Sequence, residues 1–277
     1  MPSVAEKRRT FRALHETGCF VIPNPWDIGS ARYLQGLGFK ALATTSSGAA
    51  WSLGYADGAV PLDEMLAHIG AIATASDVPV NADFLAGFAI DPEQLKVNVI
   101  RCIVTGVAGV SIEDATDDTP VLDFDLAVAR VAAARAAIDA TGGDTLLVAR
   151  AEVFFSKHPE PLKEAIRRLK AFAAVGADCL YAPGVTTRED IRALVEAVAP
   201  KPLNVLIGGP SELTVADVAA LGVRRISTGG ALARAAWAGF QAVATEIAEQ
   251  GTFNGLKNAA SGRALNDLFA DASRRPR

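Results

Sequence analysis

The feature that most constrains the fold is a regular alternation along the chain: eight short apolar runs, each followed by a stretch with the pattern of an amphipathic helix. This alternation predicts an α/β fold of the (β/α)8 TIM-barrel type. A doubly wound open sheet is the alternative, although no GxGxxG fingerprint follows the first run. The expected strands contain the runs CFVIP, KALAT, PVNAD, VAGVSIED, TLLVARAEV, CLYAP, PLNVLI and VRRIST.

The length of the chain suits one barrel. We expect residues 1–277 to form a single domain, with residues 251–277 as a more polar C-terminal extension. Within the extension, Leu265, Leu268 and Phe269 fall on one face of a further helix. The loop TTSSGAAWSLGYADGAV, before a helix at 62–75, is longer than packing requires.

Composition and charge narrow the class of partner. Half of the residues are hydrophobic but only 6% are aromatic, which suits helices packed around parallel strands. The formal net charge is -4 and the basic residues are dispersed, so a small molecule is a better partner than a nucleic acid or a membrane. Cys19, Cys102 and Cys179 lack metal-ligand spacing and each lies in an apolar run, so we expect buried thiols in a reducing compartment. With no long apolar run, a cytoplasmic location is expected.

Polar side chains gather where the expected strands end, the edge at which this type of barrel carries its active site. Each has a structural alternative: Asp27 and Asp91 as helix caps, Asp114 as the close of a turn, Glu152 as the partner of a local cation. The polar residues at this edge are Asn24, Asp27, Ser46, Ser47, Gly48, Asp57, Asn81, Asp83, Glu113, Asp114, Arg150, Glu152 and Asn204.

Several carboxylates at neighbouring strand ends repel one another unless a divalent cation or an arginine lies between them. We therefore expect a metal held by oxygen ligands. Mg²⁺ or Mn²⁺ is favoured over zinc, because the histidines share no metal-binding spacing. Arg150 offers a planar fork for a substrate carboxylate. The stretch Ser46, Ser47 and Gly48 can present backbone N–H groups to a developing oxyanion.

An ordered series of motifs, TTSSG, GYAD, PVNAD, GVAGVSIED, LLVAR, GAD and PLNV, resembles the isocitrate lyase and phosphoenolpyruvate mutase superfamily from about Val21 to Glu249. The chain is most similar to its small methylisocitrate lyase-like, oxaloacetate decarboxylase-like and 2-oxo acid-binding branch. The resemblance implies a barrel whose last helix is swapped between the subunits of a homodimer or homotetramer. It also implies Mg²⁺, a 2-oxo or 2-hydroxy acid as substrate, and the making or breaking of a C–C or C–P bond.

The resemblance also implies roles by position. Asp83 matches the carboxylate that binds the metal directly, while Asp57 and Glu113 match carboxylates that hold it through water. Arg150 matches the arginine that grips the substrate, and with Asp57 and Glu113 it makes up the expected catalytic set. The expected substrate-binding residues are Ser46, Ser47, Gly48, Asp83, Arg150 and Asn204.

The sequence departs from the family pattern in three places. Leu85 stands where a second acidic residue is usual, which weakens the expected metal site. Ala151 and Glu152 replace a threonine and an aspartate, so the pocket floor differs. The run EDATDDTPVLDFD lacks the lyases' cysteine, which disfavours cleavage of isocitrate or methylisocitrate.

The function implied is a Mg²⁺-dependent lyase that cleaves a C–C bond of a 2-oxo or 2-hydroxy acid through a metal-stabilised enolate, like an oxaloacetate decarboxylase. One alternative is a phosphonopyruvate-type C–P mutase or hydrolase. Another is a non-catalytic 2-oxo acid binder with a degenerate metal site. A group of apolar residues either lines a substrate pocket or belongs to the core: Trp26, Trp51, Phe84, Leu85 and Phe88.

Overall fold

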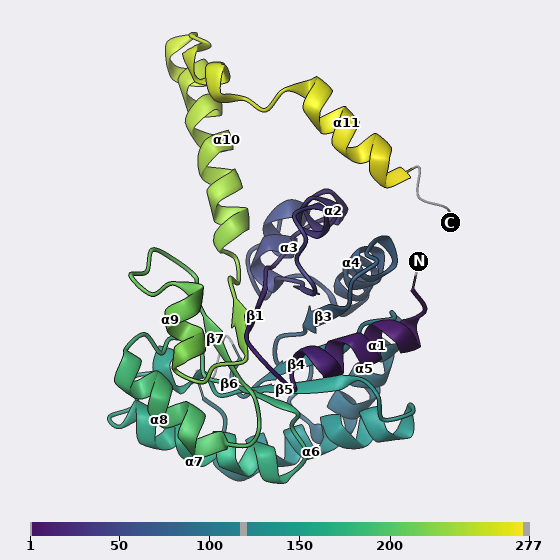
Figure 1. Ribbon diagram of the computed structural model, residues 1–277, viewed down its shortest axis with the longest axis vertical. Coiled ribbons are helices and arrows are strands. Elements are labelled where there is room, and N and C mark those ends of the chain that lie inside the picture. The colour runs from purple at the N-terminus through teal and green to yellow at the C-terminus, as the bar shows by residue number, and fades with distance from the viewer. Residues whose placement is uncertain (1, 117–120, 274–277) are drawn as a thin grey trace.

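Eight parallel strands curve into a nearly closed barrel surrounded by helices (Figure 1). The computed structural model describes residues 2–116 and 121–273. Neighbours in the sheet follow the order β1-β8-β7-β6-β5-β4-β3-β2, and the two edges are linked by a hydrogen bond from Ala43 N–H to the Pro23 carbonyl, 3.1 Å. The predicted barrel is confirmed. Its strands are β1 (Phe20–Ile22), β2 (Leu42–Ala43), β3 (Val80–Asp83), β4 (Gly109–Glu113), β5 (Leu146–Arg150), β6 (Cys179–Tyr181), β7 (Leu203–Leu206) and β8 (Arg225–Ser227).

The helices begin where the sequence offers caps. Asp27 and Asp91 are N-caps, as their structural alternative predicted, and accept hydrogen bonds from Ser30 N–H (2.6 Å) and Gln94 N–H (2.8 Å). The helices are α1 (Val4–Leu14), α2 (Ile28–Gly36), α3 (Ser46–Leu53), α4 (Leu62–Ala75), α5 (Pro92–Val104), α6 (Phe124–Ala140), α7 (Pro161–Ala174), α8 (Arg188–Val198), α9 (Val215–Ala220), α10 (Ala231–Gln250) and α11 (Gly262–Ser273). Short 3₁₀ turns are η1 (Glu152–Phe155) and η2 (Asn254–Asn258).

The long loop expected after β2 is in part a helix. Thr45 caps the start of α3 by accepting from Gly48 N–H (3.3 Å), and Gly54, in the left-handed conformation (φ 82°), ends it. The serine and glycine content of this stretch predicted a loop, but eight of its residues form a helix. As a consequence, Ser46 and Ser47 lie in the first turn of a helix.

The barrel interior is apolar at one end and polar at the other. Phe11 of α1 is fully buried against Ala41, Ala108 and Leu146, which lie at the beginnings of strands, and it closes the amino-terminal end. A larger core fills the space between the strands and the outer helices. Polar side chains point inward nearer the carboxyl ends of the strands, so a polar site opens at that end.

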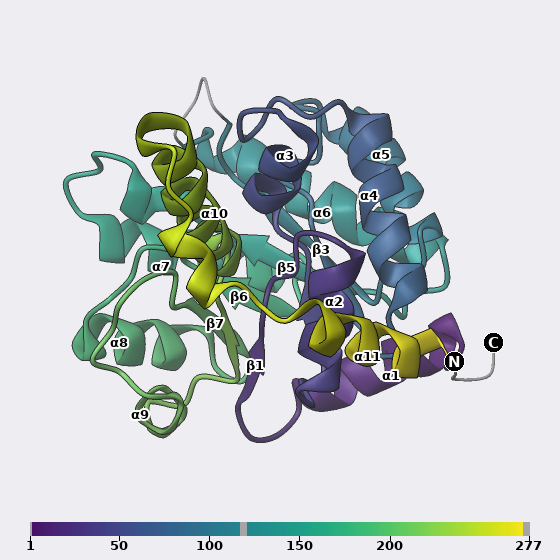
Figure 2. The ribbon, with the colours of Figure 1, turned by 90° about the horizontal axis from the view of Figure 1, so that it is seen from above.

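Helix α10 stands away from the barrel (Figures 1 and 2). Of its residues, all of which the structure describes, only Ala233 is buried, and Phe240 is 62% exposed. The chain then returns, and α11 packs on α2, where Leu268 and Phe269 lie beside Gly36 and Gly29. The expected helix in the extension is therefore present.

None of the helices in the described part of the chain has both the length and the hydrophobicity needed to cross a bilayer. Residues 117–120 of the EDATDDTPVLDFD run and the last residues of the expected tail lie outside the described ranges.

We expect the exposed apolar side chains of α10 to be covered by another copy of the chain, as the predicted helix swap requires. Sedimentation equilibrium of the 28.8 kDa chain should therefore give the mass of a dimer or tetramer. Phe240→Asp should shift the mass toward the monomer. Val104→Asp, at a 79% exposed position on α5, should leave it unchanged. A monomeric wild-type protein at micromolar concentration would contradict the swap.

Candidate active site

A cavity of about 290 Å³ lies inside the barrel at the carboxyl ends of the strands. Every strand or the loop that follows it contributes to the wall, so residues far apart in sequence meet there. The structure brings six of the predicted site residues to this wall: Ser46, Ser47, Asp57, Asp83, Glu113 and Arg150.

Arg150, the last residue of β5, binds three carboxylates. Its Nη1 lies 2.9 Å from Asp83 Oδ1 and 2.8 Å from Glu113 Oε1, and its Nε lies 2.7 Å from Glu152 Oε1. Glu113 is directly opposite Arg150 in the β4–β5 pairing, and the guanidinium also lies over the Tyr181 ring at 5.0 Å. The expected separation of the carboxylates by a cation is thus achieved here by an arginine.

Burial changes the acidity of these groups. It raises the pKa of Glu113 to about 8; Arg150 opposes the shift, and the nearby carboxylates Glu152, Asp83 and Asp57 add to it. Burial also raises the pKa of Glu152, and it raises the pKa of the Tyr181 phenol to about 12. Burial therefore favours the protonated form of Glu113, although its neighbour Arg150 carries a permanent positive charge.

Asp83 is fixed from both sides. Its Oδ2 accepts from Ser46 N–H at the start of α3 (2.9 Å), and its own N–H donates to Thr44 Oγ1 (2.9 Å). The N–H groups of Ser46 and Gly48 are therefore bound within the protein, to Asp83 and to Thr45. Of the predicted stretch, Ser47 lines the cavity with its side chain 3.1 Å from the Thr45 hydroxyl, while Gly48 is buried outside the wall.

Asn204 is fully buried and does not line the cavity. Its Nδ2 donates to Ser227 Oγ (2.9 Å), and Ser227 is in the wall. The Ser227 side chain therefore lies between Asn204 and the cavity. Asn204 can influence a ligand only through Ser227.

Sequence reasoning missed four polar wall residues that lie within strands: Ser111, Tyr181, Arg225 and Ser227. They occupy alternate strand positions whose side chains point into the barrel. The alternation within VRRIST and GVSIED was the available signal, because Arg225 and Ser227, or Ser111 and Glu113, are two residues apart.

A second group of buried charges supports the arginine. Asp114 Oδ2 accepts from Arg168 Nη1 (2.9 Å), and its Oδ1 accepts from Glu152 N–H (2.8 Å). Glu152 in turn pairs with Arg150. The structural role suggested by the sequence, pairing with a local cation, is therefore confirmed. Asp114 therefore fixes the backbone of Glu152, one of the three partners of Arg150.

The turn after β3 holds two non-glycine residues in the left-handed region, Leu85 (φ 50°) and Phe88 (φ 57°). The buried Arg130 stabilises it by donating to the carbonyls of Ala86, Ala89 and Ile90. Leu85 lines the cavity and also a neighbouring hollow of about 320 Å³, lined as well by Phe88. Phe84, by contrast, is fully buried in the core.

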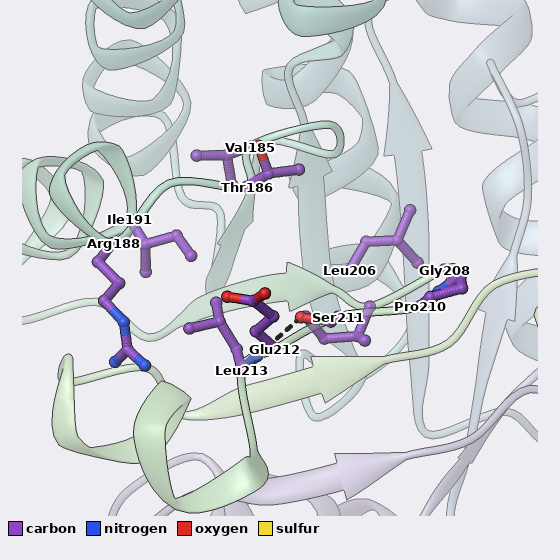
Figure 3. A pocket seen from close by; sticks show the side chains of 12 residues that line it. Val185, Thr186, Arg188, Ile191, Leu206, Gly208, Pro210, Ser211, Glu212 and Leu213 are labelled. Carbon is purple, nitrogen blue, oxygen red and sulfur yellow. Dashed lines mark hydrogen bonds between the residues drawn. The ribbon is translucent and has the colours of Figure 1, made fainter.

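A larger hollow of about 430 Å³ lies between the loops after β6 and β7, beside Leu206, which lines both spaces (Figure 3). Its charged wall residues are Arg188 and Glu212, and Arg188 pairs with Asp217 outside it (3.1 Å). No buried carboxylate group faces it within the described part of the chain. The smaller cavity is therefore the candidate active site.

The donors of the cavity suit a hard divalent cation in kind but are not arranged around one. Asp57, Asp83 and Glu113 line it and offer carboxylate oxygens, while Leu85 offers no donor. Both oxygens of Asp83 are engaged, by Arg150 and Ser46. Across residues 2–116 and 121–273, no three His, Cys, Asp or Glu side chains converge on a metal-sized point. A cation must therefore compete with Arg150 for Asp83.

Replacing Arg150 should test how far it holds the site together. Arg150→Met leaves three buried carboxylates without their cation and should lower the free energy of unfolding by about 3 kcal/mol or more in urea titrations. The matched control is Arg101→Met, which removes an exposed ion pair with Asp63 and should cost less than about 1 kcal/mol. Equal losses in the two variants would show that Arg150 is not the main stabilising charge.

The raised pKa of Glu113 predicts a pH dependence of stability in EDTA. The folded protein retains this proton up to about pH 8 and the unfolded chain loses it near the ordinary value of 4.5. The folded state thus binds more protons in this window, and the free energy of unfolding should fall as the pH rises from 4.5 to 8, by a few kcal/mol at most. Glu113→Gln should flatten this slope. An unchanged slope in the variant would place the titration elsewhere.

Comparisons with known proteins agree with the geometry. The model of the family described as phosphoenolpyruvate phosphomutase matches residues 11–248. The oxaloacetate decarboxylase of Paraburkholderia xenovorans LB400 is 32% identical over 233 residues, which cover 80% of this chain and 74% of that relative.

Two solved structures extend the likeness to the fold. A protein from Burkholderia cenocepacia J2315 matches with a TM-score of 0.92 and 44% identity over 96% of this chain and 97% of that one. Oxaloacetate acetylhydrolase in complex with its product oxalate matches with a TM-score of 0.86 and 28% identity, over 98% and 97% of the two chains. The resemblance seen in the sequence motifs is confirmed: the chain belongs to the phosphoenolpyruvate phosphomutase family, within the isocitrate lyase and phosphoenolpyruvate mutase superfamily.

Proposed function

We propose that this protein is a carbon–carbon lyase that acts on a small 2-oxo or 2-hydroxy carboxylic acid, with oxaloacetate decarboxylation as the first reaction to test. The observation that carries the proposal is the pairing of Arg150 with Asp83 and Glu113 in the cavity at the carboxyl ends of the strands. The likeness to oxaloacetate decarboxylases supports it.

Arg150 would bind and stabilise negative charge on the substrate. When the C–C bond of oxaloacetate breaks, CO₂ leaves and the electron pair of that bond remains on the three-carbon fragment as an enolate. The guanidinium, held in place by its ion pairs, favours this charge. Ser47, whose hydroxyl lines the cavity, would orient a carboxylate or keto oxygen.

Glu113 would supply the proton that completes the reaction. Its raised pKa favours a protonated carboxyl group, and transfer of that proton to the enolate carbon gives pyruvate. Solvent then restores the proton on Glu113. The cycle needs no thiol acid, which agrees with the absence of a cysteine from the stretch that follows β4.

We further propose Mg²⁺ or Mn²⁺ as cofactor, bound directly by Asp83 and through water by Asp57 and Glu113. The ion would supply positive charge at the keto oxygen of the substrate. Positive charge near Glu113 would also lower its pKa and make its proton easier to transfer. With Leu85 in place of a second acid, and Arg150 competing for Asp83, we expect weak binding.

Two alternatives share this site. A C–P mutase or hydrolase acting on a phosphonopyruvate-type substrate would use the same cavity. A non-catalytic 2-oxo acid binder is favoured by one observation, the ion pairs that Arg150 makes where the metal is expected. In all three cases we expect a cytoplasmic homodimer or homotetramer.

Pyruvate release from oxaloacetate, followed with lactate dehydrogenase and NADH, tests the proposal. Because Mg²⁺ alone promotes this decarboxylation, each rate is compared with the same buffer without protein. We expect a rate well above that background with Mg²⁺, and a loss of at least about 100-fold in Arg150→Met. Arg101→Met should retain full activity. Phosphonopyruvate, assayed for phosphate or phosphoenolpyruvate, distinguishes the C–P alternative.

Rates equal to the metal background for wild-type protein would contradict a decarboxylase. If oxaloacetate nevertheless binds in calorimetry, the non-catalytic binder becomes the better account. If EDTA leaves an enzyme-dependent rate unchanged, the proposed lyase activity is supported and the proposed metal cofactor is contradicted.

A further inference from the structure

A second buried arginine lies deeper in the same cavity. Arg225, the first residue of β8, is 2% exposed and forms part of the cavity wall. Its Nη1 donates to Asn81 Oδ1 over 3.4 Å, a long contact, and its Nε is buried without a hydrogen-bond partner in the described residues. Arg225 is therefore a cation aimed at the cavity with little to bind.

The charges of the site are unevenly shared between the two arginines. Asp83, Glu113 and Glu152 all pair with Arg150. Among the residues that the structure describes, no carboxylate forms an ion pair with Arg225. Its guanidinium lies 5.9 Å from the centre of the Phe11 ring, at the outer limit of a cation–π contact. A buried guanidinium without a carboxylate partner carries a desolvation cost, and an anion bound in the cavity would offset it.

The neighbours of Arg225 suit an anionic ligand. Asn81 donates its side-chain N–H to Ser111 Oγ (2.8 Å), which leaves the Ser111 hydroxyl hydrogen free to be donated into the cavity. Ser111 is also in the wall. Arg225 and Ser111 can together bind one carboxylate.

The spacing of the two arginines sets the size of the ligand. Arg225 contacts Asn81, and Arg150 contacts Asp83, two residues further along β3. Two residues of a strand span roughly 6–7 Å, so the contacts of the two arginines, Asn81 and Asp83, are separated by about that distance along β3. A short dicarboxylic acid can bridge the two arginines within the cavity of about 290 Å³.

We propose that Arg225 and Ser111 form an anion subsite at the floor of the cavity, which binds one carboxylate of a dicarboxylic acid while Arg150 binds the other. The inference rests on the proposed function, because it takes this cavity as the substrate site. It restricts the substrate to short diacids and makes Arg225 a determinant of specificity. Simple 2-oxo monocarboxylates then bind poorly.

Isothermal titration with two four-carbon acids tests the subsite without turnover. Succinate and butyrate share a chain length and differ by one carboxylate. In EDTA, wild-type protein should bind succinate at least about 10-fold more tightly than butyrate. Arg225→Met should remove this preference, and Arg225→Lys should retain part of it. Arg224→Met, which removes an adjacent arginine that bonds the Gly18 carbonyl outside the cavity, should leave the preference unchanged.

Loss of a buried arginine can prevent folding, so Ser111→Ala provides an independent variant. It should weaken succinate severalfold and leave butyrate unchanged. Equal affinities for the two acids in wild-type protein, no binding of succinate at millimolar concentration, or a preference that survives in Arg225→Met and Ser111→Ala would each overturn the subsite. A succinate preference in a protein that fails to decarboxylate oxaloacetate would refute the proposed lyase activity and leave the subsite standing.

Discussion

The charge of Arg150 is the feature on which the rest of the site depends. The carboxyl groups of Asp83, Glu113 and Glu152, from neighbouring elements, all contact this one guanidinium, which offsets the cost of placing them close together. Parallel pairing puts Glu113 directly beside Arg150, so the barrel itself enforces the contact. The same guanidinium that joins these carboxylates is the group best placed to receive a substrate carboxylate.

Rigid supports surround this arginine. Arg168 and Asp114 fix the backbone of Glu152, and Arg130 holds the carbonyls of the turn that carries Leu85. Each support is a buried charge with several hydrogen bonds, which keeps the carboxylates in place when the charge balance in the cavity changes. The chemistry therefore depends on a preorganised frame, in which a bound cation would have to displace Arg150 from Asp83.

Much of this frame could be predicted from the sequence, because apolar runs and helix caps are local signals. The barrel, the caps Asp27 and Asp91, and the meeting of Asp83, Glu113 and Arg150 at one cavity follow from them. Features that depend on packing could not be predicted. Helix α3 begins with serines and a glycine, and the sequence alternation that turns Arg225 inward does not show which residues of neighbouring strands it meets. Asn204 faces Ser227 for the same reason.

The measurement that tests the central claim most directly is a crystal structure of the protein with Mg²⁺ and oxalate, a stable mimic of the enolate of a 2-oxo acid. The account predicts oxalate against Arg150 in the cavity, with the cation at Asp83 and Arg150 turned away from that carboxylate. An empty cavity in which Arg150 still joins Asp83 to Glu113, with metal and oxalate both at saturating concentration, would contradict it.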